Sequence, residues 1–204
     1  MRDWTMEDMI REYLSSLDTS YINKLRALVT QSTDKELEVI SDRLVQQANI
    51  TYTNKKDELT MYSIIEDEGV FITQVQYLAD ELSIVALYRL IEIKHKRLLE
   101  IIKKKPSSNY SYWGNVTDDF PEIKSLNHYP IVNELRLLNN SIKHGGVVSK
   151  WLAEITDLYG NENEELQNIG ENYERLLEGA KEYVKELYGY VSAQDEFKEA
   201  YKLD

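Results

Sequence analysis

Residues 131–146 bring together side chains that can move a proton and hold a phosphate. The stretch reads IVNELRLLNNSIKHGG. Histidine titrates near neutral pH and serves as an acid or a base, while arginine and lysine hold a phosphate and stabilise charge that builds on it. Asn140 lies one helical turn before His144 and can orient its ring. With Arg136 and Lys143, this set has the parts needed to cleave a phosphodiester without a metal.

The spacing of the stretch predicts a helix that separates these side chains from an apolar stripe. At 3.6 residues per turn, the apolar residues fall on one side and the polar ones on the other, within an arc of roughly 100°. The apolar stripe comprises Ile131, Leu135, Leu138 and Ile142, and the polar face comprises Asn133, Arg136, Asn140, Lys143 and His144. Gly145 and Gly146 should end the helix, because glycine enters a left-handed cap freely. A Lys-His pair before glycine is also simply a favourable helix end, and spacing alone leaves that interpretation open.

The run from Glu134 to Gly145 resembles the signature helix of the HEPN superfamily. Members carry an Arg-Asn or Arg-polar pair followed a few residues later by histidine, often as RNxxxH and then glycine. Asn140 and His144 match this pattern, and the usual arginine position falls on Asn139. Arg136 lies one turn before Asn140, on the same expected face, and can substitute. The order of helices over residues 66–191 is also similar to that superfamily.

The resemblance implies an all-α, up-and-down helical bundle over residues 58–204, with an N-terminal helical segment, 1–57, packed on it. It further implies a homodimer in which the two signature helices face each other. Many members are metal-independent endoribonucleases that act as toxins or in bacterial stress and antiviral defence, with no cofactor. On that basis His144, Arg136 and Asn140 are the expected catalytic residues, Lys143 is expected to bind an RNA substrate, and no metal site is expected. The alternative is a catalytically inactive HEPN-like regulatory module that binds a protein partner encoded nearby.

A second basic cluster lies near the end of a long helix expected over residues 66–104. It contains Lys94, His95, Lys96 and Arg97, with three further lysines at 103–105. Cations there complement the negative end of the helix dipole, which is one interpretation. The other is that His95, Lys96 and Arg97 form a phosphate-binding wall and so contribute to substrate binding. The sequence leaves both open.

The remaining elements are expected around these two. Short helices are predicted over residues 1–31, a new helix start at residues 32–34, and a loop at 50–57, with a short strand there as the alternative. The long helix would span roughly 55 Å, so we expect a kink or a break in it and an end at Pro106. Residues 106–130 are expected to form a flap beside the site, anchored by Trp113 and Phe120. In a final amphipathic helix over 166–191, three glycines, including Gly179, suggest close packing against another helix.

Composition limits the classes of function. The chain has 204 residues, 42% of them hydrophobic, which fits a soluble globular protein. It contains no cysteine, which excludes disulfides, zinc–thiolate sites and thiol catalysis. The net charge of −12 argues against stable binding of long nucleic acids, but not against a local basic pocket. Neither a signal peptide nor a membrane span is expected, so we predict a cytoplasmic protein.

Overall fold

Long runs without proline, and with few glycines, build the chain from α-helices. The computed structural model describes residues 5–102, 110 and 112–201. Its helices are α1 (Met6–Ser15), α2 (Ser20–Ala48), α3 (Lys55–Ile102), α4 (Trp113–Asp119), η1 (Pro121–Ser125), α5 (Tyr129–Lys143), α6 (Lys150–Ala153), α7 (Ile169–Ser192) and α8 (Asp195–Tyr201). Within those described ranges, β pairing is limited to one isolated bridge between Val147 and Glu165. The predicted all-α class is therefore confirmed.

The chain divides into two compact units, and α3 contributes to both. One unit is residues 20–83, and the other is residues 1–19 together with 84–204. The expected boundary after residue 57 thus falls in the first turn of α3, inside the smaller unit.

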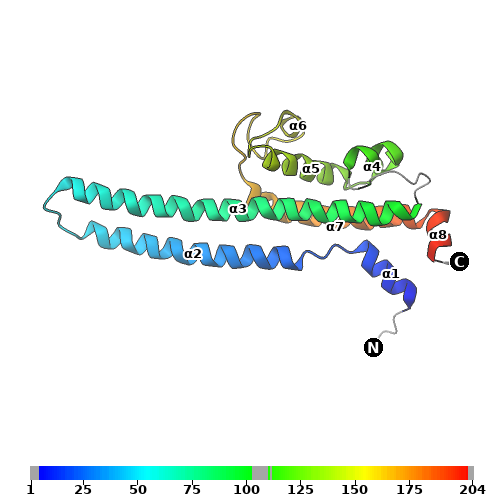
Figure 1. The fold of residues 1–204 in the computed structure, drawn as a ribbon, viewed down its shortest axis with the longest axis horizontal. Helices are drawn as coiled ribbons and strands as arrows, with labels where there is room; N and C mark the ends of the chain where they lie inside the picture. Colours follow the sequence, from blue (N-terminus) through cyan, green and yellow to red (C-terminus); the bar gives the residue numbers. More distant parts are fainter. Residues whose placement is uncertain (1–4, 103–109, 111, 202–204) are drawn as a thin grey trace. The chain divides into compact units, whose positions relative to one another are not determined.

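The smaller unit is a hairpin of two antiparallel helices, α2 and the first part of α3 (Figure 1). Polar contacts bridge the two helices. Arg26 Nη2 lies 2.8 Å from Asp80 Oδ1, and Thr33 Oγ1 donates to Gln76 Oε1 at 3.0 Å. Thr33 also bonds the carbonyl of Val29 within its own helix. The helix start predicted at residues 32–34 is therefore wrong, because the hydroxyl expected to cap a new helix instead lies inside the long helix α2.

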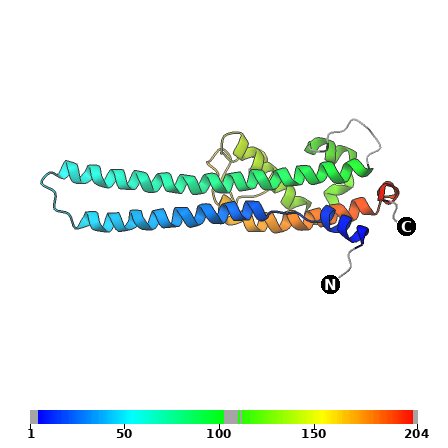
Figure 2. The same cartoon turned by 60° about the horizontal axis from the view of Figure 1, so that its bottom comes forward.

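In the larger unit, the second part of α3 packs against α7 (Figure 2). Its buried residues recur at helical spacing, which gives the helix one continuous apolar face. They include Ile84, Leu87, Ile91, Leu98 and Ile102. The matching face of α7 includes Tyr173, Leu176, Ala180, Val184 and Leu187.

Helix α5 crosses α7 at a glycine. A Cβ on Gly179 would lie 3.0 Å from Ile131 Cβ and closer still to Ile131 Cγ2. Such distances leave no room for a side chain. The predicted close approach is therefore present at Gly179, whereas a Cβ on Gly189 would meet nothing within 4 Å.

The segment expected to be a flap is partly helical where it is described. It contains α4 and the short 3-10 helix η1, and Val116 and Ile123 are fully buried. Its two predicted anchors make ring contacts, Trp113 with Tyr129 at 5.5 Å and Phe120 with Tyr110 at 5.3 Å between centroids. Pro106 and the lysines at 103–105 lie outside the described residues.

One described helix, α3, is long and apolar enough to cross a membrane by length and composition alone. Core helices of soluble proteins pass the same test. The cytoplasmic location therefore stays a prediction.

Candidate functional site

The helix that carries the candidate site begins and ends where the sequence indicates. Pro130 lies in the first turn of α5, where its missing N–H costs nothing. At the other end, His144 is the capping residue, and its N–H donates to the Asn140 carbonyl at 3.0 Å. Gly145 and Gly146 follow with φ of 124° and 71°, in the left-handed region that glycine tolerates best.

Helix α5 is held by a wider buried face than the predicted stripe. Leu135 and Leu138 are fully buried as expected, whereas Ile131 and Ile142 are half-buried. Further side chains on the helix are buried as well, namely Val132, Glu134, Leu137, Asn139 and Ser141. The exposed end of the helix is confined to Lys143 and His144, and Arg136 and Asn140 are half-buried.

Three of the predicted residues line one groove on α5. Arg136, Asn140 and His144 follow one another at intervals of one helical turn, and all three face a groove of about 500 Å³. The rest of the lining comes from α5 itself and from the segment that follows it, with Ser141, Ser149, Trp151 and Asn163 among its members. Helical spacing predicts that the three side chains share one face of α5, and the structure adds the wall opposite them.

That wall is a compact loop between α5 and α7. The N–H of Val148 donates to the Glu164 carbonyl at 2.8 Å, and the N–H of Asn163 donates to the Val148 carbonyl at 2.9 Å. Ser141 on α5 and Ser149 in the loop are hydrogen-bonded through their hydroxyls at 2.9 Å. Backbone bonds and this serine pair therefore fix the width of the groove.

Arg136 stands between this groove and a second cavity of about 360 Å³. Its Nη2 donates to Asn133 Oδ1 at 2.9 Å, and its guanidinium lies 5.4 Å from the centroid of the Trp113 ring. Lys143 lines the second cavity rather than the groove, together with Tyr88. Two cations of α5, Arg136 and Lys143, therefore border two adjacent cavities, which suits a ligand with more than one negative group.

Asn139, at the position where the superfamily usually carries arginine, faces the interior. Only 1% of it is exposed. Its amide nitrogen lies 3.4 Å from Asn140 Oδ1, a weak contact, and its own oxygen has no hydrogen-bond partner among the described residues. A ligand in the groove would therefore meet Arg136 rather than residue 139.

The structure does not bring the second basic cluster to this groove. His95 is 2% exposed and is hydrogen-bonded to the Tyr183 hydroxyl at 2.8 Å, with the Trp113 ring 5.5 Å away. Burial lowers the pKa of His95 from 6.5 to about 3, so the imidazole is neutral at physiological pH. A neutral, buried ring cannot form part of a phosphate-binding wall.

Two of the neighbouring cations, Lys94 and Arg97, interact with helix α1. Lys94 donates to the carbonyls of Tyr13 and Leu14, at 2.7 and 3.3 Å, near the end of α1. Burial, followed by the charge of Arg97, lowers the pKa of Lys94 to about 8. Arg97 bonds the Tyr13 hydroxyl and lies over its ring, while Lys96 is exposed. The cluster complements a negative helix end, but the end is that of α1 rather than that of its own helix.

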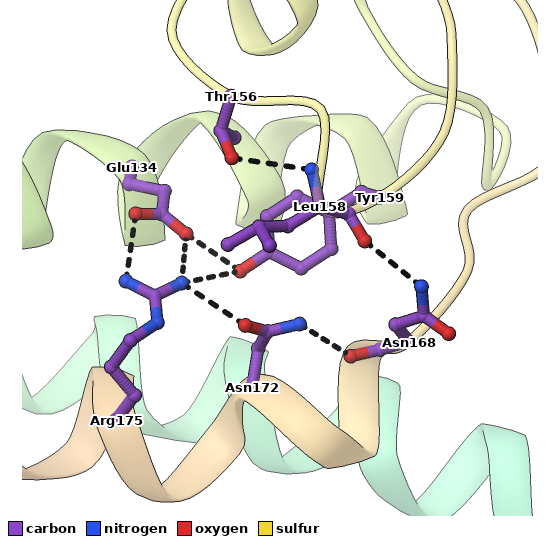
Figure 3. Close-up of polar contacts among 7 residues, drawn as sticks. All are labelled: Glu134, Thr156, Leu158, Tyr159, Asn168, Asn172 and Arg175. Atoms are coloured by element: carbon purple, nitrogen blue, oxygen red, sulfur yellow. Dashed lines mark hydrogen bonds and ion pairs between the residues drawn. The ribbon is translucent and has the colours of Figure 1, made fainter.

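Sequence reasoning missed a polar cluster on the opposite side of α5 (Figure 3). Glu134 accepts from Arg175 Nη1 at 3.0 Å and from the Tyr159 hydroxyl at 2.7 Å. Burial and the Glu134 carboxylate raise the pKa of Tyr159 well above its usual range. The cluster ties α5 to α7 and to the loop before α7, and thereby fixes the helix that lines the groove. No local sequence pattern predicts this cluster, because its members are up to 41 residues apart in the chain.

Trp151, in helix α6 of the segment that follows α5, is exposed. Its side chain is 64% exposed and lines the groove, with Lys150 Nζ 5.6 Å from its ring centroid. An exposed indole beside cations is a surface on which a base or another flat ring can stack.

Among the residues that the structure describes, no group of three or more histidine, aspartate or glutamate side chains is arranged to hold a metal ion. The chain was also compared with known proteins. No family model, no curated protein and no solved structure matches it.

Proposed function

We propose that the α5 groove binds an RNA phosphodiester and cleaves it without a metal, as the resemblance of its helix to the HEPN signature suggests. The observation that carries the proposal is that Arg136, Asn140 and His144 line the same groove, with His144 exposed at its end. An imidazole, a guanidinium and an amide in one groove are the groups that this reaction uses.

In the proposed reaction, His144 takes the proton from a ribose 2′-hydroxyl. The 2′-oxygen forms a bond to phosphorus, the bond from phosphorus to the 5′-oxygen breaks, and the leaving oxygen takes a proton from water. The products are a 2′,3′-cyclic phosphate and a 5′-hydroxyl end. Arg136 stabilises the negative charge on the phosphoryl oxygens, Asn140 orients the ring of His144, and Lys143 holds a neighbouring phosphate.

Two features suit a transient encounter with single-stranded RNA. Trp151 offers a stacking surface beside the groove. The net charge of −12 argues against stable retention of a duplex, and local cations act within a screening length of about 8 Å. The cysteine-free composition suits the reducing cytoplasm, where RNA is found.

The second candidate function is an inactive, HEPN-like module that regulates a partner protein. The burial of Asn139 favours it, because the side chain at the position that carries arginine in the superfamily is uncharged here and only 1% exposed. In that case the groove would be a remnant, and a partner encoded nearby would bind another surface.

The test is incubation of the purified protein with total RNA in the presence of EDTA. We expect cleavage by the natural protein and a loss of at least roughly 100-fold in rate for His144→Ala, the range for removal of a general base. His144 is exposed, so its replacement should leave folding unchanged. Lys124→Ala, at an exposed position of η1, is the control and should cleave at the natural rate.

Equal and negligible cleavage by the natural protein and His144→Ala would remove the ribonuclease proposal. Equal but substantial cleavage by both would point to a contaminating nuclease and remove it as well. The regulatory alternative then predicts that the product of a neighbouring gene is retained in a pull-down with this chain.

A further inference from the structure

The helical hairpin of the smaller unit exposes many large apolar side chains to solvent. Large apolar side chains that are more than a third exposed recur along both of its helices. On α2 they include Tyr21, Leu25, Leu28 and Val39, and on α3 they include Met61, Ile64, Phe71, Leu78 and Leu82. Contiguous apolar surface of this kind marks an interaction site.

These nine side chains, here called the outer stripe, follow a coiled-coil pattern. On α3 they fall at residues 61, 64, 71, 78 and 82, with half-buried Val75 completing alternating steps of three and four. Such steps make a straight seam along a helix, and that seam fits another helix. On α3 the polar gap in this seam is Glu68, whose charge is met by Arg43 of the same hairpin.

The members of the outer stripe on α2 and those on α3 lie on the same side of the hairpin. Each member directly precedes a residue of the inner seam between α2 and α3, as Tyr21 precedes Ile22 and Ile64 precedes Ile65. In an antiparallel pair, equal offsets from the seam point to the same side. A groove of about 440 Å³ lined by Val39, Ile64 and Phe71 agrees with this placement.

The area of this face is that of a stable interface. The nine side chains are between 37% and 63% exposed. At roughly 100 Å² each, about half the surface of a large side chain, they offer roughly 900 Å², against about 800 Å² per partner in a specific complex. A two-helix hairpin also buries little hydrophobic core of its own, and association with a second hairpin would form a larger one.

Charge indicates what covers the face. Between residues 57 and 83, α3 carries no lysine or arginine and seven carboxylates: Asp57, Glu58, Glu66, Asp67, Glu68, Asp80 and Glu81. Every cation within α2 and this part of α3 lies on α2: Lys24, Arg26, Lys35 and Arg43. Lys24 and Lys35 border or occupy the line of the outer stripe, next to Leu25 and between Leu28 and Val39. Helix α2 also carries four carboxylates, Asp34, Glu36, Glu38 and Asp42, so it is neutral overall. The acidic part of α3 therefore meets less repulsion against α2 of a second copy than against another α3.

We propose that the outer stripe is the interface between two copies of this chain, with α2 of one copy packed on α3 of the other in a two-fold symmetric four-helix bundle. Each helix then has two helical neighbours, one across the inner seam and one across the outer stripe, as in antiparallel bundles. The interface lies in the smaller unit, so it is separate from α5 and does not depend on the proposed chemistry.

The first test is the solution mass of the full chain over a range of concentrations. We expect twice 23.9 kDa for the natural chain and a monomer for Phe71→Glu, with at least a roughly 10-fold weaker dimer. Val70→Glu is the matched control, because Val70 is 57% exposed beside Phe71 but points away from the stripe. A monomeric natural chain, or equal effects of the two substitutions, would overturn the proposal.

A milder variant covers the case in which Phe71→Glu fails to fold. The chain has no cysteine, so Leu78→Cys introduces a single thiol within the stripe. Its reaction with a thiol reagent should slow as protein concentration rises, while a thiol from Val70→Cys should react at a constant rate. A Leu78→Cys rate independent of concentration would overturn the proposal.

Salt distinguishes the arrangement. With α2 on α3 of the partner, Lys24 and Lys35 would face carboxylates of that α3, so added salt and Lys35→Glu should each weaken the dimer several-fold. If α3 met α3, carboxylates would face carboxylates and salt would strengthen the dimer instead. That result would overturn the arrangement, as would a natural monomer that binds lipid vesicles through the stripe.

Discussion

His95 and His144 lie on helices of the same unit, but their surroundings differ completely. His144 is exposed at the end of α5, next to a groove. His95 is enclosed by Tyr183 and Trp113, and burial lowers its pKa to about 3. Desolvation penalises the charged imidazole, so the same residue type serves as a neutral core group in one place and as a candidate proton carrier in the other.

Burial of His95 should make the protein less stable in acid. Between pH 6.5 and about 3, the unfolded chain binds a proton that the folded one excludes, so the free energy of unfolding rises with pH across this window. The contribution is complete above pH 6.5 and is lost as the pH falls towards 3. We expect the slope for the natural chain to exceed that for His95→Gln by about 1.4 kcal/mol per pH unit, measured by urea unfolding between pH 6 and 4. Equal slopes would contradict the neutral state.

The cluster around Glu134 should contribute to the stability of the groove. Replacing Arg175 with methionine leaves the buried carboxylate without its cation, with only Tyr159 as a donor. Because Arg175 is partly exposed, we expect a cost of about 2 kcal/mol, below that of a fully buried pair. Thermal unfolding measures it. Lys181→Met, which removes an exposed pair with Glu178 on the same helix, should change stability by less than about 0.5 kcal/mol.

At the scale of elements, the crossing of α5 and α7 holds the site helix in place. Gly179 allows Ile131 to approach the backbone of α7, and Leu176 and Ala180 beside it are fully buried. The glycines in the final helix could be read from the sequence as marks of close packing. Which of them is in contact could not, because that depends on where α5 crosses α7, and the residues in contact, Ile131 and Gly179, are 48 positions apart in sequence.

Two alanine substitutions in α7 should therefore have opposite effects. Gly179→Ala forces a methyl group into Ile131, and we expect a loss of about 1–3 kcal/mol, more than the gain in helix propensity. Gly189→Ala meets nothing within 4 Å, so it should stabilise by up to about 1 kcal/mol. Urea unfolding of both variants measures the difference. A stabilised Gly179→Ala protein would show that α5 and α7 are not in close contact.

Helix ends lie where the sequence indicates them when the capping residues are neighbours in the chain. Pro130 and Gly145 delimit α5, and the paired bonds of Thr5 and Asp8 open α1. The prediction failed at Thr33, where a cap-forming residue lies inside α2 because its hydroxyl bonds Val29 and Gln76. A local pattern cannot distinguish these cases, since the competing partner comes from another helix.

At the scale of the molecule, α3 contributes to two units that bury it to different extents. Its second part has an almost fully buried face against α7, whereas its first part pairs with α2 and leaves an outer stripe exposed. Apolar residues recur at helical spacing along the whole of this helix. The boundary between the two units near residue 83 therefore cannot be identified from the sequence. The division appears only when the neighbours of each half are known.

The sequence by itself determined the all-α class, the ends of α5, and the common face of Arg136, Asn140 and His144, because helical periodicity and caps act over a few residues. Only the tertiary structure decided that His95 and Asn139 are buried and that Lys94 and Arg97 serve α1. It alone also supplied the wall that turns the α5 face into a groove. Burial depends on which distant segments pack together, and packing changes what a side chain can do through desolvation and through partners that no local spacing contains.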